Sequence, residues 1–166
     1  MEEVEALSTK EIIRKLRSFG VDFKREQFLE DVKRFYSAYE LAYQWMDIYP
    51  VTAVGFDEYF IGMAANVLWQ RLAPDVITSE QLDDMMQRGY DLKEEGKAKE
   101  CCNLWLEVWE HLKKRFSPDM IDIEATRSVF GGTQSLYNWC QDLEMELFNT
   151  FIVGNFSQWK LFSSIS

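Results

Sequence analysis

The chain has 166 residues, 47% of them hydrophobic and 15% aromatic, which is enough material for one domain with a sizeable buried core. Its 18 lysines and arginines against 28 acidic residues give a formal net charge of −10, which argues against nucleic acid or an anionic membrane as the main partner. With 3 prolines and 8 glycines, it is neither collagen-like nor a low-complexity chain.

The N-terminus and the cysteines favour a cytoplasmic protein. The first residues, Met1–Glu5, are acidic and lack the basic and apolar runs of a secretory signal. No stretch of about 18 uncharged apolar residues is present, so no transmembrane helix is expected. Cys101 and Cys102 are adjacent and Cys140 is alone, a pattern that favours reduced thiols over disulfides.

Helical periodicity dominates the sequence, beginning with two predicted helices. Ser8 and Glu11 form a capping-box pattern at the start of the first helix, and Gly20 predicts its end. A long apolar stripe then predicts one helix of about five turns, closed by Pro50. The members of that stripe are Phe28, Val32, Phe35, Tyr36, Tyr39, Ala42, Tyr43 and Met46.

Four further helices follow, at intervals set by glycine and proline. The third lies between Gly55 and Pro74, and the fourth runs from a cap at Thr78 to Gly96. The apolar stripe of the fourth consists of Leu82, Met85, Met86, Gly89 and Leu92.

The fifth helix follows Lys97 and ends at Pro118, and the sixth follows the break at Gly131 and Gly132. The segment 121–130 is expected to be a short helix or an irregular loop. No segment alternates with a period of two for long, so almost no strand is expected.

A sequence pattern recurs 44 residues apart, in Leu68–Glu80 and Leu112–Glu124. Leu, Arg, Pro, Asp, Ile and Glu stand at equal offsets in the two copies, which indicates a recurring helix end about one helical hairpin apart. Chance convergence of two helix stops is the alternative, because proline is common after helices.

The hairpin from about Gln81 to Lys114 resembles a degenerate tetratricopeptide repeat. Small and large residues stand where that repeat places them to let two helices approach closely: Gly89, Leu92, Gly96, Cys101, Trp105 and Val108. The chain departs from the pattern at Met85, where the repeat has Trp, and at Pro118, where the closing proline comes late.

More widely, Phe28–Glu146 resembles a helical region of bacterial proteins of undefined function, which carry tetratricopeptide-like repeats and sometimes a cysteine-rich SEC-C metal motif. The segments that carry this resemblance are Gln27–Val32, Leu68–Pro74, Leu104–Glu110 and Cys140–Leu147. The metal motif is absent here, so its metal role is not carried over.

Together, the pattern and the resemblance predict an all-α fold. We expect antiparallel helical hairpins, stacked as a short right-handed tetratricopeptide-like solenoid of about six main helices. Residues 1–150 are expected to form a single helical repeat domain, and 151–166 an atypical C-terminal tail that forms a short helix or a shortened end.

Catalytic chemistry finds little support in the residues present. Glu107 and His111 share a helix face, but a two-carboxylate iron site needs another acid, and the sequence has no second histidine. Acidic pairs such as Asp57-Glu58 can divide acid and base roles, although a solvated surface is their expected role in so acidic a chain. We therefore expect no enzyme, metal or cofactor, with a carboxylate- or metal-dependent enzyme as an alternative.

The cysteines and tryptophans have both functional and packing interpretations. A thiol near Lys97 and Lys99 at a helix start would be reactive, but Cys101 falls on an apolar stripe, which favours core packing. The 6 tryptophans could form a ligand cage, but most of them lie on apolar stripes.

The expected function is a non-catalytic protein–protein interaction or scaffolding module that binds a protein or peptide, with a basic segment suiting the acidic surface. In tetratricopeptide geometry the first helix of each hairpin lines the groove, which implies Asp83, Met86, Tyr90 and Lys93 as contacts. The alternative is a truncated structural segment of a longer repeat array, which self-associates as a homodimer through the C-terminal helix.

Overall fold

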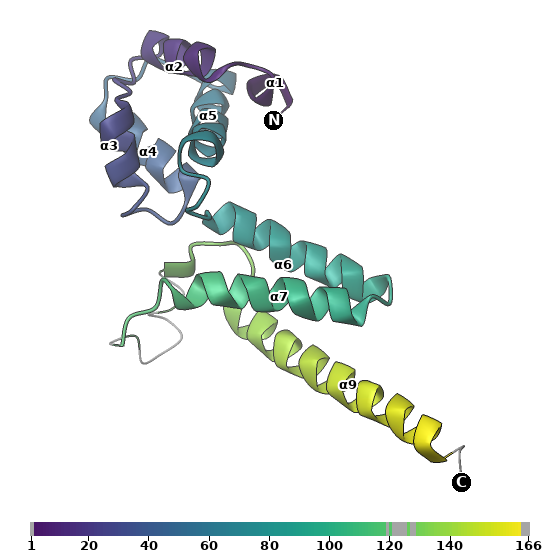
Figure 1. Ribbon diagram of the computed structural model, residues 1–166. Coiled ribbons are helices and arrows are strands. Elements are labelled where there is room, and N and C mark those ends of the chain that lie inside the picture. The colour runs from purple at the N-terminus through teal and green to yellow at the C-terminus, as the bar shows by residue number, and fades with distance from the viewer. Residues whose placement is uncertain (1, 119, 121–125, 127–128, 164–166) are drawn as a thin grey trace. The chain divides into compact units, whose positions relative to one another are not determined.

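The computed structural model describes residues 2–118, 120, 126 and 129–163, with the backbone alone for 2, 3 and 151–163. These residues form helices and no strand, so the all-α prediction is confirmed for the described chain (Figure 1). No described helix combines the length and the apolar character that a membrane crossing requires.

The chain forms two compact units, Met1–Glu80 and Gln81–Ser166. The boundary between the two units, after Glu80, lies inside the predicted domain over 1–150, and a single helical repeat domain stays a prediction. The stacking of hairpins into a solenoid is likewise untested, and each unit is described by itself below.

In the first unit, α5 (Phe56–Leu72) is the central helix, against which α1 (Glu2–Glu5), α2 (Thr9–Ser18) and α4 (Ala38–Ile48) pack. Its buried residues lie on all sides of the helix: Phe60, Ile61, Gly62, Ala64, Ala65, Asn66, Val67, Leu68 and Trp69. A helix buried all round needs neighbours on every side, which explains why the short preceding helices gather around it.

The first predicted helix is α2, and its signals act as expected. The Ser8 hydroxyl accepts from the Glu11 N–H at 3.3 Å, and the Ser8 N–H donates to the Glu11 carboxylate at 2.8 Å, which completes the capping box. Gly20 follows the helix with φ of +96°. A Cβ there would lie 2.5 Å from the carbonyl oxygen of Pro50, so the close approach of these segments requires glycine.

The predicted long helix through Phe28–Met46 is wrong, because the chain breaks into α3 (Arg25–Asp31) and α4 with a turn between them. Ser37 stands in extended conformation as the N-cap of α4, and its hydroxyl accepts from the Glu40 N–H at 3.1 Å. The break therefore gives α4 a capped N-terminus of its own.

In the second unit, α6 (Ser79–Glu94, whose first two residues belong to the first unit) and α7 (Ala98–Lys113) approach closely at Gly89. A Cβ on Gly89 would lie 1.9 Å from Nε1 of Trp105, and that nitrogen donates to the carbonyl of Met86 at 3.0 Å. A small residue opposite a large one is the packing that the spacing predicts.

The last described helix, α9 (Leu136–Ser163), packs on α7 and continues through residues 151–163, which were expected to form an atypical tail. Gly131, with φ of +62°, lies in the predicted break before it. Of the segment 121–130, residues 121–125 and 127–128 lie outside the described residues, and Val129 and Phe130 are helical.

The two copies of the recurring pattern share one structural role at their arginines. The Arg71 guanidinium donates to the carbonyls of Leu7 and Glu5, both at 2.7 Å. At the equivalent position, Arg115 donates to the carbonyls of Val129 and Phe130, both at 3.2 Å. In each copy, the arginine near the end of the helix donates to the backbone of another segment of the same unit.

Candidate functional site

A groove in the first unit runs between α4 and the beginning of α5 and has a volume of about 400 Å³. Ala42 and Gly62 are its buried lining residues and form its floor. The complete lining is Tyr39, Ala42, Tyr43, Met46, Gly55, Glu58, Tyr59 and Gly62. The groove lies wholly within one compact unit, so its shape depends on that unit alone.

The rings beside this groove are strongly exposed. Tyr43 is 64% exposed, Tyr59 71% and Phe56 93%, and the rings of Phe56 and Tyr59 pair with centroids 6.4 Å apart. Ile48 and Val54, near the end of α4 and before α5, are exposed as well. Large apolar side chains gathered at a hollow are typical of binding surfaces.

Glu80 fixes the N-terminal end of α4, which carries Tyr39 into the groove. Its carboxylate accepts from the Ser37 hydroxyl, from the Ala38 N–H at 3.3 Å and from the Tyr39 N–H at 3.4 Å. These N–H groups have no partner inside the helix, and negative charge is favourable at a helix N-terminus. Glu80 thus orients the first turn of α4 on which one wall of the groove stands.

Tyr39 packs directly on the backbone of α5 because residue 62 is glycine. A Cβ on Gly62 would lie 2.8 Å from the Tyr39 ring, too close for an unshifted side chain. Burial raises the pKa of the Tyr39 phenol, and the nearby Glu80 and Tyr43 raise it further. The groove therefore presents a neutral phenol at neutral pH.

The predicted groove contacts on α6 lie elsewhere, and in the second unit they have partners of their own. Met86 is fully buried, so it offers no surface to a ligand in this structure. The Tyr90 hydroxyl donates to Asp142 at 2.8 Å, and the Lys93 ammonium lies 3.3 Å from Glu146.

Asp83, the fourth predicted contact, is equally engaged. Its carboxylate accepts from the Thr133 N–H at 2.5 Å, from the Thr133 hydroxyl at 2.7 Å and from the Gln134 N–H at 3.2 Å. The four predicted residues share α6, where Asp83, Tyr90 and Lys93 hold the segment from Thr133 to Glu146 and Met86 is buried. Contact with a partner by any of them stays a prediction.

The candidate nucleophile and metal ligands belong to the second unit, whereas the groove belongs to the first. Burial, followed by Cys102 and Glu146, raises the pKa of Cys101 to about 11, so its thiol stays protonated at neutral pH. Burial and Lys114 lower the pKa of His111. Within the described part of the chain, no group of three or more His, Cys, Asp or Glu residues is placed to hold a metal ion.

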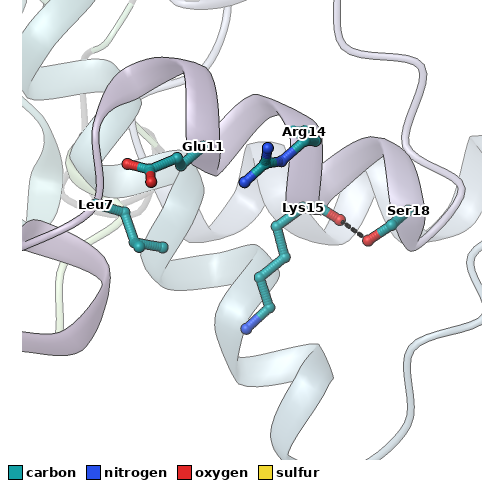
Figure 2. A pocket seen from close by; sticks show the side chains of 5 residues that line it. All are labelled: Leu7, Glu11, Arg14, Lys15 and Ser18. Carbon is teal, nitrogen blue, oxygen red and sulfur yellow. Dashed lines mark hydrogen bonds between the residues drawn. The ribbon is translucent and has the colours of Figure 1, made fainter.

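A second hollow, on α2, also has a volume of about 400 Å³ (Figure 2). The Lys15 ammonium lies 4.1 Å from the ring centroid of Phe60 in α5, and the Ser18 hydroxyl donates to the Lys15 carbonyl at 2.7 Å. This hollow is lined by Leu7, Glu11, Arg14, Lys15 and Ser18. Its charges are mixed and its lysine is already paired, so we favour the groove on α4 and α5.

No family model, curated protein or solved structure matches the chain. The resemblance to tetratricopeptide repeats therefore stays a prediction, and the functional argument rests on the groove.

Sequence reasoning missed this groove because it placed Tyr39, Tyr43 and Met46 on the buried stripe of one long helix. The buried face of α4 consists of Ala38, Leu41, Ala42 and Trp45. One sequence signal was present: from Ser37 to Gln70 there is no Lys, Arg or His, although the span contains four of the 7 tyrosines and four carboxylates. Such a composition favours a surface that binds another molecule.

Proposed function

We propose that this chain is a non-catalytic protein-interaction module whose groove between α4 and α5 binds a segment of a partner protein. The observation that carries the proposal is the set of exposed rings, Tyr43, Phe56 and Tyr59, around a hollow of about 400 Å³. Tyr and Phe are enriched at protein interfaces because they bury a large area for few rotatable bonds.

The capped α4 helix supports the proposal energetically. Because Glu80 and Ser37 already fix the first turn of α4, a ligand that contacts Tyr39 meets an ordered wall. Binding to a preorganised wall loses less conformational entropy than binding to one that must first order.

The proposal also includes the predicted helical-repeat architecture and the predicted cytoplasmic location. A right-handed tetratricopeptide-like stacking is supported by the α6–α7 hairpin, in which Gly89 lies against Trp105. A cytoplasmic location is supported by the cysteines at 101, 102 and 140, all of which are free thiols.

A random peptide library displayed on phage, panned against the full chain, tests the groove. We expect enriched peptides whose binding is lost in the Tyr43→Ala/Tyr59→Ala variant. Tyr137→Ala is the matched control, because Tyr137 is also an exposed tyrosine but lies on α9. Enriched peptides that bind all three proteins equally, or a library that yields none, would contradict the proposal.

Self-association is a second candidate function, favoured by one observation on α9. Tyr137, Met145 and Phe148 are exposed, and their spacing places them on one face of the helix. Sedimentation over a range of protein concentrations would show a dimer that Phe148→Ala weakens, whereas a monomer at all concentrations would eliminate this candidate.

A further inference from the structure

The part of α4 and α5 up to Gln70, which includes the whole groove lining, carries negative charge only, and Arg71 in the last turn of α5 donates to the carbonyls of Leu7 and Glu5. Between Ser37 and Gln70 the sequence holds Glu40, Asp47, Asp57 and Glu58, and no Lys, Arg or His. Glu58 lines the groove itself and is exposed. A hollow whose neighbouring charges share one sign attracts ligands of the opposite sign.

The rings in the groove add a second preference for a cation. Tyr39, Tyr43 and Tyr59 all line it, and an aromatic face attracts an ammonium or guanidinium group electrostatically. Elsewhere on α5 the chain supplies such a cation itself, because the Lys15 ammonium lies over the Phe60 ring. Neither α4 nor the part of α5 that lines the groove contains a cationic side chain.

We infer that the groove binds a lysine or arginine side chain of the partner segment. The cationic group lies among the rings of Tyr43 and Tyr59, and the Glu58 carboxylate balances its charge. The aliphatic stem of that side chain packs on Met46 and the buried floor. This inference rests on the proposed function and names the chemistry that the groove recognises.

A methyl signal inside the groove provides a local measurement. The full chain, labelled with ¹³C at its methionine methyls, is titrated with acetyl-Gly-Arg-Gly-amide, with the Lys tripeptide, and with the Gln and Leu tripeptides as neutral probes. Met46 lines the groove, whereas the exposed Met145 on α9 serves as an internal control. We expect the Arg and Lys tripeptides to shift the Met46 signal in a saturable way, leaving Met145 unchanged.

Three substitutions separate the contribution of the Glu58 charge from that of the Tyr59 ring. Tyr59→Leu, which removes an exposed ring, is expected to weaken Arg-tripeptide binding by about 2- to 30-fold. Tyr59→Phe keeps the ring and is expected to retain binding. Glu58→Gln removes only the charge, and its effect is expected to shrink as salt is added. A loss in Tyr59→Phe equal to that in Tyr59→Leu would overturn the role of the ring.

The outcomes distinguish this inference from the proposed function. If the Leu tripeptide shifts Met46 as strongly as the Arg tripeptide, the groove is a general apolar site and the cationic inference is overturned. No shift with any probe up to about 10 mM also overturns it. In both cases peptide display still decides whether the groove binds a protein segment, because the library contains uncharged sequences.

Discussion

Two helix faces in this chain have similar residue types and very different surroundings. The face of α6 carries Tyr90 and Lys93, whose polar groups are paired with Asp142 and Glu146 inside the second unit. The groove face of α4 carries Tyr39 and Tyr43, which line a hollow. The first face holds a unit together, and the second lines an open hollow.

This difference shows why residue type alone is a poor guide to a binding site. Tyrosine and charged groups serve packing as readily as recognition, and their role depends on whether the chain supplies a neighbour. At α6 the neighbour is the segment from Thr133 to Glu146. The predictions below test whether the two faces differ in stability as they do in structure.

The largest expected effect is that of Trp105→Ala. Trp105 is fully buried, lies against Gly89 and donates to the Met86 carbonyl, so truncation leaves a cavity and removes that hydrogen bond. We expect a loss of about 3–5 kcal/mol in the free energy of unfolding, measured by urea denaturation and circular dichroism.

Tyr59→Ala, at the exposed groove, is the contrasting substitution. It is expected to change the free energy of unfolding by no more than about 0.5 kcal/mol. Equal losses in Trp105→Ala and Tyr59→Ala would remove the distinction between the two faces. Trp105→Phe, which keeps an aromatic ring, should recover part of the lost stability and provides a folded variant if Trp105→Ala does not fold.

Glu80→Gln, which weakens the cap of the groove helix α4, is expected to have an intermediate effect on the free energy of unfolding. The substitution removes the negative charge and one of the two acceptor oxygens that cap α4. We expect a loss of about 1–2 kcal/mol in urea denaturation.

Glu40→Gln is the matched control, because Glu40 is exposed in the first turn of the same helix and loses the same charge. Its expected loss is only about 0.5 kcal/mol, from the helix dipole. If the two variants lose equal stability, Glu80 acts through general charge alone and does not position the wall of the groove.

Local signals in the sequence predict those parts of the fold that depend on neighbouring residues. The capping box of Ser8 and Glu11, the turn at Gly20 and the packing of Gly89 against Trp105 follow from short spacings. Such features are fixed by the chain within one or two helical turns, or within one hairpin.

The break before α4 could not be predicted in the same way. It is stabilised by Glu80, which lies 43 residues after Ser37 in the sequence. The apolar spacing also continues across the break, so Tyr39 and Tyr43 resemble members of the stripe that Phe28 begins. A contact between residues distant in sequence therefore determines where α4 begins and which of its side chains line the groove.

The smallest expected effect is a loss of stability in mildly alkaline solution, which compares the closed interior at α7 with the open groove. Burial raises the pKa of Cys101 to about 11 in the folded chain, whereas a thiol in the unfolded chain ionises near pH 8.5. The raised pKa contributes stability that is complete below about pH 8.5 and is lost as the pH rises toward 11.

Between pH 7.5 and 9.5, with a reductant present, the midpoint of urea unfolding should therefore fall more for the unchanged chain than for Cys101→Ala. The raised pKa of Tyr39 does not obscure this difference, since Tyr39 is present in both proteins. An equal fall in the two proteins would mean that water reaches Cys101, and that the interior beside Trp105 is as open as the groove.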